Sequence, residues 1–164
     1  GCLLAGSVLR TWQSDIGDID WIITPDDFTK LYEKLKDYPN RKFGLVHSFN
    51  IDDVQHDFII VEPGKFRWPW WYWSLGAKVA CAYRAMAEFE GKSFKPTGLY
   101  DRKTDKLITD DPEKTNLPWT RSPAGAWHPT QLIETYIEDN KLTEAKRRKL
   151  RSLYIKKSRE LRKG

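Results

Sequence analysis

The sequence predicts an α+β fold, in which a mixed or antiparallel sheet with helices is followed by a small α/β part and by C-terminal helices. Three observations predict it. Apolar runs of strand length recur over the first 62 residues, an amphipathic helical pattern separates two of them, and two helical patterns end the chain after a turn-rich stretch. With 164 residues, of which 40% are hydrophobic, the chain is long enough for one domain or for two small lobes.

The N-terminal segment is predicted to hold two strands with a short helix between them. Residues 2–5 (CLLA) form an apolar run that ends at Gly6, and residues 18–24 (DIDWIIT) form a β-rich run that Pro25 closes. A strand that ends in Gly-Ser allows a short helix to begin at its edge, so we expect one directly after Gly6.

The next segment predicts a helix and a pair of strands. Residues 25–38 start with Pro-Asp-Asp, place apolar side chains at helical spacing and stop before Pro39, which is typical of an amphipathic helix. Residues 41–50 and 54–62 are rich in β-forming residues and are separated by Ile-Asp-Asp, so we expect them to pair antiparallel. Together with the two preceding strands they predict one sheet layer.

A dense aromatic segment then interrupts this pattern. Residues 63–73 (PGKFRWPWWYW) combine two prolines with aromatic rings that suit either packing between two lobes or stacking on nucleic-acid bases. Residues 74–92 place small and apolar residues at helical spacing and predict a helix that ends at Gly91. Residues 96–109 predict a hairpin.

The C-terminal part combines two helical patterns, over residues 129–140 and 143–163, with a strong positive charge. The whole chain carries +5, but residues 141–163 hold eleven Lys and Arg against two Glu. The preceding 140 residues hold 17 Lys and Arg against 21 Asp and Glu, so they are mildly acidic. This asymmetry suits a polyanionic partner such as nucleic acid, and equally a solvated surface helix.

Several classes of protein are not expected. No apolar run reaches the roughly 18 residues of a membrane span, and the N-terminal residues are too polar for a signal peptide. Cys2 and Cys81 form neither a disulfide framework nor a metal motif. We therefore expect a monomer that is neither secreted nor bound to a membrane, in a reducing location such as the cytoplasm, a nucleoid or a viral replication site.

Two aspartates, one residue apart, open the strand predicted at residues 18–24. Because side chains alternate along a strand, Asp18 and Asp20 share one face, while Ile19 and Trp21 pack toward the other. Carboxylates this close repel one another unless a cation binds them, and Asp57 supplies a third if its strand lies alongside. Oxygen ligands of this kind suit two Mg²⁺ ions, with Mn²⁺ as a substitute.

A possible anion-binding pattern precedes the acids. Gly6 and Ser7 would place free backbone N–H groups and a hydroxyl at the start of the expected short helix, and Arg10 would add a forked cation one turn later. Gly17 permits close approach of the backbone. A triphosphate could then bind between these donors on one side and metal ions held by the acids on the other. So short a pattern also occurs in ordinary surface turns. The third acid, Asp57, lies within a run of β-forming residues, and its presence there favours a functional site.

Several motifs follow one another in a recognisable order. GS is followed by R and by GDIDWIIT, and KFGLVHSF precedes HDFIIV. The later segments are YWSLGAKVACAYRAMAEFEG, PTGLYDRKTDKLI and DDPEKTNLPWTRSP. In this order they resemble the nucleotidyltransferase superfamily, and most closely the family X DNA polymerases related to DNA polymerase beta, whose Tyr-Phe-Thr-Gly helix, thumb hairpin and closing segment match the later three. The resemblance covers most of the chain.

The resemblance implies a palm domain over residues 1–66, a thumb over 67–127 and a basic helical extension over 128–164. Two acids, Asp18 and Asp20, would bind both metal ions. The third would bind the catalytic ion and help deprotonate the primer 3′-hydroxyl. The incoming dNTP would be held by Gly6, Ser7, Arg10, Gly17, Tyr72 and Trp73. DNA would be contacted by Arg84 in the thumb and, from the charge of the extension, by Lys146, Arg147 and Arg148.

The chain also departs from the family pattern. Ala77, Ala80 and Cys81 stand where the family has residues that contact the incoming base and the template, and Gln55 replaces an arginine beside the third aspartate. These differences bear on base selection more than on the chemistry. We expect a minimal, low-fidelity DNA polymerase of the gap-filling repair type. The alternatives are a template-independent nucleotidyltransferase that acts on RNA ends or on a protein hydroxyl, and a nucleic-acid-binding module with a decayed active site.

Overall fold

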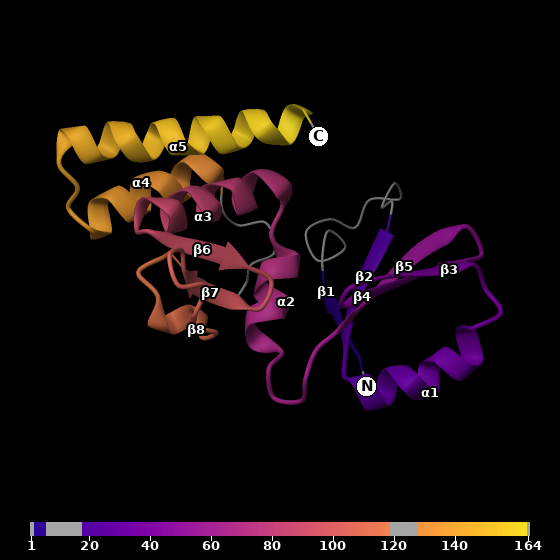
Figure 1. Ribbon diagram of the computed structural model, residues 1–164. Coiled ribbons are helices and arrows are strands. Elements are labelled where there is room, and N and C mark those ends of the chain that lie inside the picture. The colour runs from indigo at the N-terminus through magenta and orange to yellow at the C-terminus, as the bar shows by residue number, and fades with distance from the viewer. Residues whose placement is uncertain (1, 6–17, 119–127, 164) are drawn as a thin grey trace. The chain divides into compact units, whose positions relative to one another are not determined.

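The computed structural model describes residues 2–5, 18–118 and 128–163, which belong to two compact units divided between Ser74 and Leu75 (Figure 1). Each unit contains helices and a sheet, so the expected α+β class is confirmed. The division differs from the expected boundaries at residues 66 and 127, because the aromatic segment packs on the first sheet and the C-terminal helices belong to the second unit. No helix in the described part of the chain is long and apolar enough to cross a membrane.

The first unit is built on a five-stranded sheet in the order β1-β2-β5-β4-β3. Strands β2 and β5 pair parallel, and the other neighbours pair antiparallel, so the sheet is mixed. The strand expected over residues 41–50 is divided by a turn at Gly44, whose φ of +54° suits glycine. The strands are β1 (Cys2–Ala5), β2 (Asp18–Ile23), β3 (Asn40–Phe43), β4 (Val46–Ile51) and β5 (Val54–Ile60).

Helix α1 (Pro25–Leu35) covers one face of this sheet. Thr24 caps its N-terminus, where the Thr24 side chain accepts a hydrogen bond from the Asp27 N–H at 3.3 Å, and Pro25 occupies the first turn. The helix ends three residues before the expected end at residue 38, in a turn. Its apolar side chains pack on a cluster of buried residues that all point to this face: Ile23, Phe49 and Phe58.

His47 lies among the aromatic rings beneath α1 and is only 9% exposed. Its Nε2 lies 2.9 Å from the side-chain oxygen of Asn40, whose amide nitrogen donates to the carbonyls of Lys36 and Tyr38. That oxygen is therefore an acceptor, and the imidazole donates through Nε2. Burial, and secondarily the Lys42 charge, lower the pKa of His47 below its ordinary value of 6.5.

We expect the first unit to lose stability as the pH falls below about 6.5, because unfolded His47 takes up a proton that the folded state excludes. One such group lowers the free energy of unfolding by at most about 1.4 kcal/mol per pH unit. Thermal unfolding at about pH 7.5 and pH 5 measures the effect, and the pH response should be flatter in His47→Gln, which keeps an N–H donor. An equal pH response in the two proteins would assign the effect to other groups.

The aromatic segment forms helix α2 (Arg67–Ser74), which the sequence pattern did not predict. Pro69 lies in its first turn, where the missing N–H breaks no hydrogen bond of the helix. The segment packs on the sheet face opposite α1, over a buried apolar cluster that comprises Ile22, Ile59 and Val61. The rings in contact with this cluster are those of Phe66, Trp70 and Trp73. For these three rings, packing is the observed role.

The second unit is organised around helix α3 (Ala77–Phe89), which is buried over most of its length. The hairpin expected over residues 96–109 is present as β7 (Gly98–Asp101) and β8 (Leu107–Thr109), joined by a further strand, β6 (Lys92–Lys95). Figure 1 shows this sheet and the two C-terminal helices on opposite sides of α3. The remaining elements are a short 3-10 helix (Pro112–Lys114), α4 (Pro129–Asp139) and α5 (Glu144–Lys163).

Candidate metal centre

Three aspartates from two neighbouring strands converge on one face of the first sheet. Asp20 on β2 lies directly beside Asp57 on β5 in the parallel register, and Asp18 lies beside Gln55. One carboxylate oxygen of each aspartate lies within 4.8 Å of an oxygen of each of the other two. The structure therefore brings together the three acids that the sequence analysis selected.

Beyond the acids and their polar neighbours, this sheet face continues as an apolar surface. Ile22 and Ile59 follow Asp20 and Asp57 at the next alternate positions of β2 and β5, and the rings of the α2 segment pack over them. Asp18 and Asp20 lie in the N-terminal half of β2 and Asp57 in the middle of β5, and all three are partly buried. The acids thus lie beside a packed apolar cluster.

Two hydrogen bonds hold one oxygen of the Asp57 carboxylate. The hydroxyl of Ser48, on β4, donates to Oδ1 at 2.5 Å, and the side-chain amide of Gln55 donates to the same oxygen at 2.9 Å. The second oxygen, Oδ2, accepts no hydrogen bond from the described residues. Because both donors are neutral, they orient the carboxylate without cancelling its charge, and Oδ2 stays open to a cation or a proton.

Ser48 is a site residue that the sequence analysis did not select. It lies opposite Asp57 in the antiparallel register of β4 and β5. A signal was present, because Ser48 is the polar residue between His47 and Phe49 in an alternating run, and the acids occupy the face that it shares. Only the register, however, identifies which acid it contacts.

The donor set fits a hard divalent cation. Mg²⁺ binds carboxylate oxygens at about 2.1 Å, so two oxygens on opposite sides of one ion are roughly 4.2 Å apart. The 4.8 Å limit on the separations of the aspartate oxygens is close to this value. Three carboxylates without a histidine or cysteine in their group favour Mg²⁺ or Mn²⁺ over Zn²⁺.

Comparison of the chain with protein-family models and with curated proteins finds no match. The candidate centre therefore stands on its own geometry and on the order of the sequence motifs. The four predicted phosphate-binding residues lie outside the described residues, together with the short helix expected near them: Gly6, Ser7, Arg10 and Gly17.

The other predicted nucleotide-binding residues lie on α2. The rings of Tyr72 and Trp73 are partly buried and meet edge to face, with their centroids 5.4 Å apart. Trp73 also packs on the apolar cluster of the sheet, so part of its surface is used in the core of the first unit. The nucleotide-binding role of these two rings therefore stays a prediction.

The predicted DNA-binding residues belong to the second unit and differ in exposure. Arg84 is partly buried on α3. Lys146 is exposed, and the guanidinium of Arg148 lies 3.6 Å from the carboxylate of Glu144. Arg147 instead donates from Nε to the backbone carbonyl of Leu142 at 2.9 Å, so its side chain lies along the start of α5. Of the three residues selected in the extension, Arg147 is the least accessible.

Proposed function

We propose that the chain is a metal-dependent nucleotidyltransferase that adds deoxynucleotides to a DNA 3′ end, as a minimal gap-filling polymerase of low fidelity. The convergence of Asp18, Asp20 and Asp57 on adjacent strands carries this proposal. The mixed sheet is compatible with a nucleotidyltransferase palm, and the order of motifs that resembles the family X polymerases gives it further support.

The residues of the centre have separate roles in the proposed reaction. Bound Mg²⁺ would stabilise negative charge on the phosphates and favour ionisation of the attacking hydroxyl. Asp18 and Asp20 would hold both cations, and Asp57 would help to hold the catalytic one. The 3′-oxygen forms a bond to the α-phosphorus, the bond to pyrophosphate breaks, and the hydroxyl proton passes to Oδ2 of Asp57. Ser48 and Gln55 aim that oxygen by holding Oδ1.

Primer extension tests this proposal. The protein is given Mg²⁺ and each dNTP separately, with a duplex that contains a one-nucleotide gap and, in parallel, with the same primer as a single strand. The expected result is incorporation on the gapped duplex and none on the single strand, with the complementary nucleotide preferred over the other three. Absence of incorporation with either substrate, in Mg²⁺ and in Mn²⁺, would overturn it.

The template-independent transferase remains a second candidate because two positions offer no base readout. Ala77 presents only a methyl group, and Ala80 is buried in the second unit with 8% of its surface exposed. Cys81, where the family has a template-stacking lysine, is also buried, and its thiol donates to the backbone carbonyl of Lys157 at 3.6 Å. Extension of the single strand with all four nucleotides would favour this candidate.

A further inference from the structure

Five of the ten cations of α5 form two sets, of which the first faces its own unit. Arg151 donates from two nitrogens to the two carboxylate oxygens of Glu134 on α4, at 3.1 and 3.0 Å. Lys157 lies 2.9 Å from the carboxylate of Glu88 on α3. Hydrogen bonds from Lys157 and Arg102 lower the pKa of Glu88, so this carboxylate stays charged. These inward cations help to hold α5 against its neighbours.

The second set faces outward. Lys149, Lys156 and Arg159 are exposed, and within the described residues neither Lys156 nor Arg159 has a carboxylate at ion-pair distance. At about 100° per residue, the three lie within a sector of roughly 80° of the helix. They extend over about 15 Å of its length at about 1.5 Å per residue. The sector is opposite the side that Leu150 buries, and Lys149 forms its edge, with Nζ 5.9 Å from the centre of the Phe89 ring.

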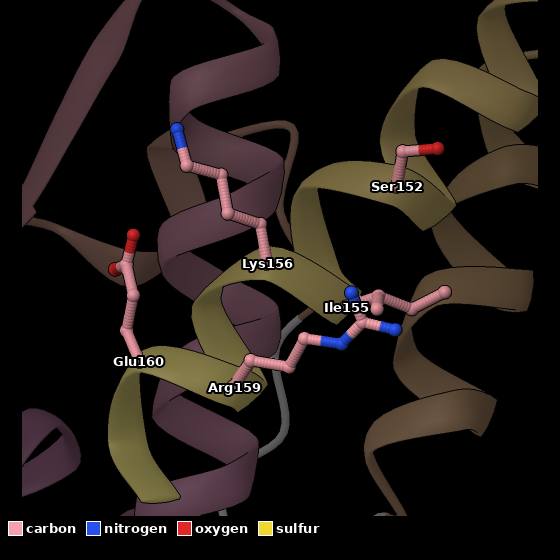
Figure 2. Close-up of a pocket in the computed structure, with 5 residues that line it drawn as sticks. All are labelled: Ser152, Ile155, Lys156, Arg159 and Glu160. Atoms are coloured by element: carbon pink, nitrogen blue, oxygen red, sulfur yellow. The ribbon is translucent and has the colours of Figure 1, made fainter. Parts of the chain in front are cut away.

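A hollow of about 420 Å³ lies along this outward sector and is lined by Ser152, Ile155, Lys156, Arg159 and Glu160. Figure 2 shows the five side chains projecting from α5. The lining combines an ammonium, a guanidinium and a hydroxyl, which are the donors that proteins use to bind phosphate oxygens. One lining residue, Glu160, is acidic and opposes an anion there.

The surface suits a nucleic-acid backbone better than a membrane. A helix that lies on a bilayer needs a free apolar stripe, but α5 packs on α3 and buries Leu150 completely. The exposed large apolar side chains of α5 in the described residues are Ile155, at 49% exposure, and Leu161, at 41%, and at about 100° per residue neither lies within the cationic sector. The length of the cationic sector matches about four phosphates of one strand, at a rise of about 3.4 Å each.

We propose that the outward sector of α5, through Lys149, Lys156 and Arg159, binds the phosphate backbone of nucleic acid. The site is separate from the metal centre and needs neither a metal ion nor a nucleotide. It gives the proposed enzyme a substrate-holding surface, yet it stands whether or not the chain transfers nucleotides. Its contacts are electrostatic, so binding should be independent of sequence and should weaken steeply with salt.

Fluorescence anisotropy of a labelled DNA duplex of about 20 base pairs, in EDTA, tests the surface. The double variant Lys156→Gln/Arg159→Gln should bind the duplex about ten-fold more weakly than the wild type. The slope of its log K against log salt concentration should be smaller in magnitude by about 0.9 for each phosphate that the variant no longer neutralises. The matched control is Lys30→Gln/Lys34→Gln, which removes the same charge from exposed positions of α1 and should bind like the wild type. Glu160→Gln should bind more tightly.

Three outcomes would overturn the proposal. Unchanged binding by the α5 variant excludes this surface, and an equal loss in both double variants shows that only net charge matters. Binding of the wild type to vesicles rich in phosphatidylserine, without binding to the duplex, identifies a membrane as the partner instead. Because the assay contains no Mg²⁺ or dNTP, its failure is independent of the primer-extension result, and an inactive chain that binds DNA would overturn only the proposed function.

Discussion

Replacing Asp57 by Asn is expected to lower nucleotidyl transfer by about 10²–10⁴-fold, the range associated with loss of a catalytic proton acceptor. The variant loses the negative charge and the oxygen that is open for the proton, while its side-chain carbonyl still accepts from Ser48 and Gln55. Incorporation of one nucleotide into a gapped duplex at saturating dNTP measures the effect.

The same substitution should not unfold the first unit. Three carboxylates within 4.8 Å of one another repel without a cation, so Asp57→Asn is expected to be at least as stable as the wild type in EDTA. The rise in Tm that Mg²⁺ produces in the wild type should shrink in the variant, because a ligand stabilises only the state that binds it. Retained turnover, or an unchanged response to Mg²⁺, would remove Asp57 from the centre.

A matched control is available on the same hairpin. Asp53 is exposed in the turn between β4 and β5, and its φ of +67° is one that asparagine tolerates well. Asp53→Asn therefore makes the same charge change outside the centre and should keep full activity and the full Mg²⁺ response. Ser48→Ala should have an activity and a Mg²⁺ response between those of Asp57→Asn and Asp53→Asn. Its metal affinity should be about 10–100-fold lower than in the wild type, because the Asp57 carboxylate remains but loses a hydrogen bond that orients it.

Replacing Leu150 by Ala is expected to destabilise the second unit by about 2–5 kcal/mol, as in other fully buried sites. Leu150 has no exposed surface and lies on α5, which packs along α3. A loss of this size is a large part of the roughly 5–15 kcal/mol that stabilises a typical domain. Urea unfolding followed by far-UV circular dichroism measures it, because the long helices of this unit dominate that signal.

Ile155→Ala provides the control on the same helix. Its side chain is 49% exposed, so removing it should change the free energy of unfolding by less than about 0.5 kcal/mol. Equal stability of the two variants would contradict the packing of α5 on α3. In that case the assignment of the α5 cations to an inward and an outward set would also be wrong.

The local features of the molecule follow from the amino-acid sequence alone. Alternation along residues 18–24 placed Asp18 and Asp20 on one face, and the Pro-Asp-Asp start of α1 and the β-rich runs before and after Ile51 identified their elements. Such features depend on spacing and propensity within a few residues. The α+β class follows from their order.

Which residues lie beside one another is set by the packing of the whole chain. Residues 67–74 became a helix because their rings find an apolar sheet face to cover, a gain that local propensity does not contain. The contact of Ser48 with Asp57 depends on the register of β4 and β5, since a shift by one residue would turn Ser48 to the other face. Likewise, the cations of α5 are alike in sequence, and only packing on α3 and α4 separates Arg151 and Lys157 from Lys156 and Arg159. Long-range pairing and burial arise between segments that are far apart in the chain, so the local pattern cannot specify them.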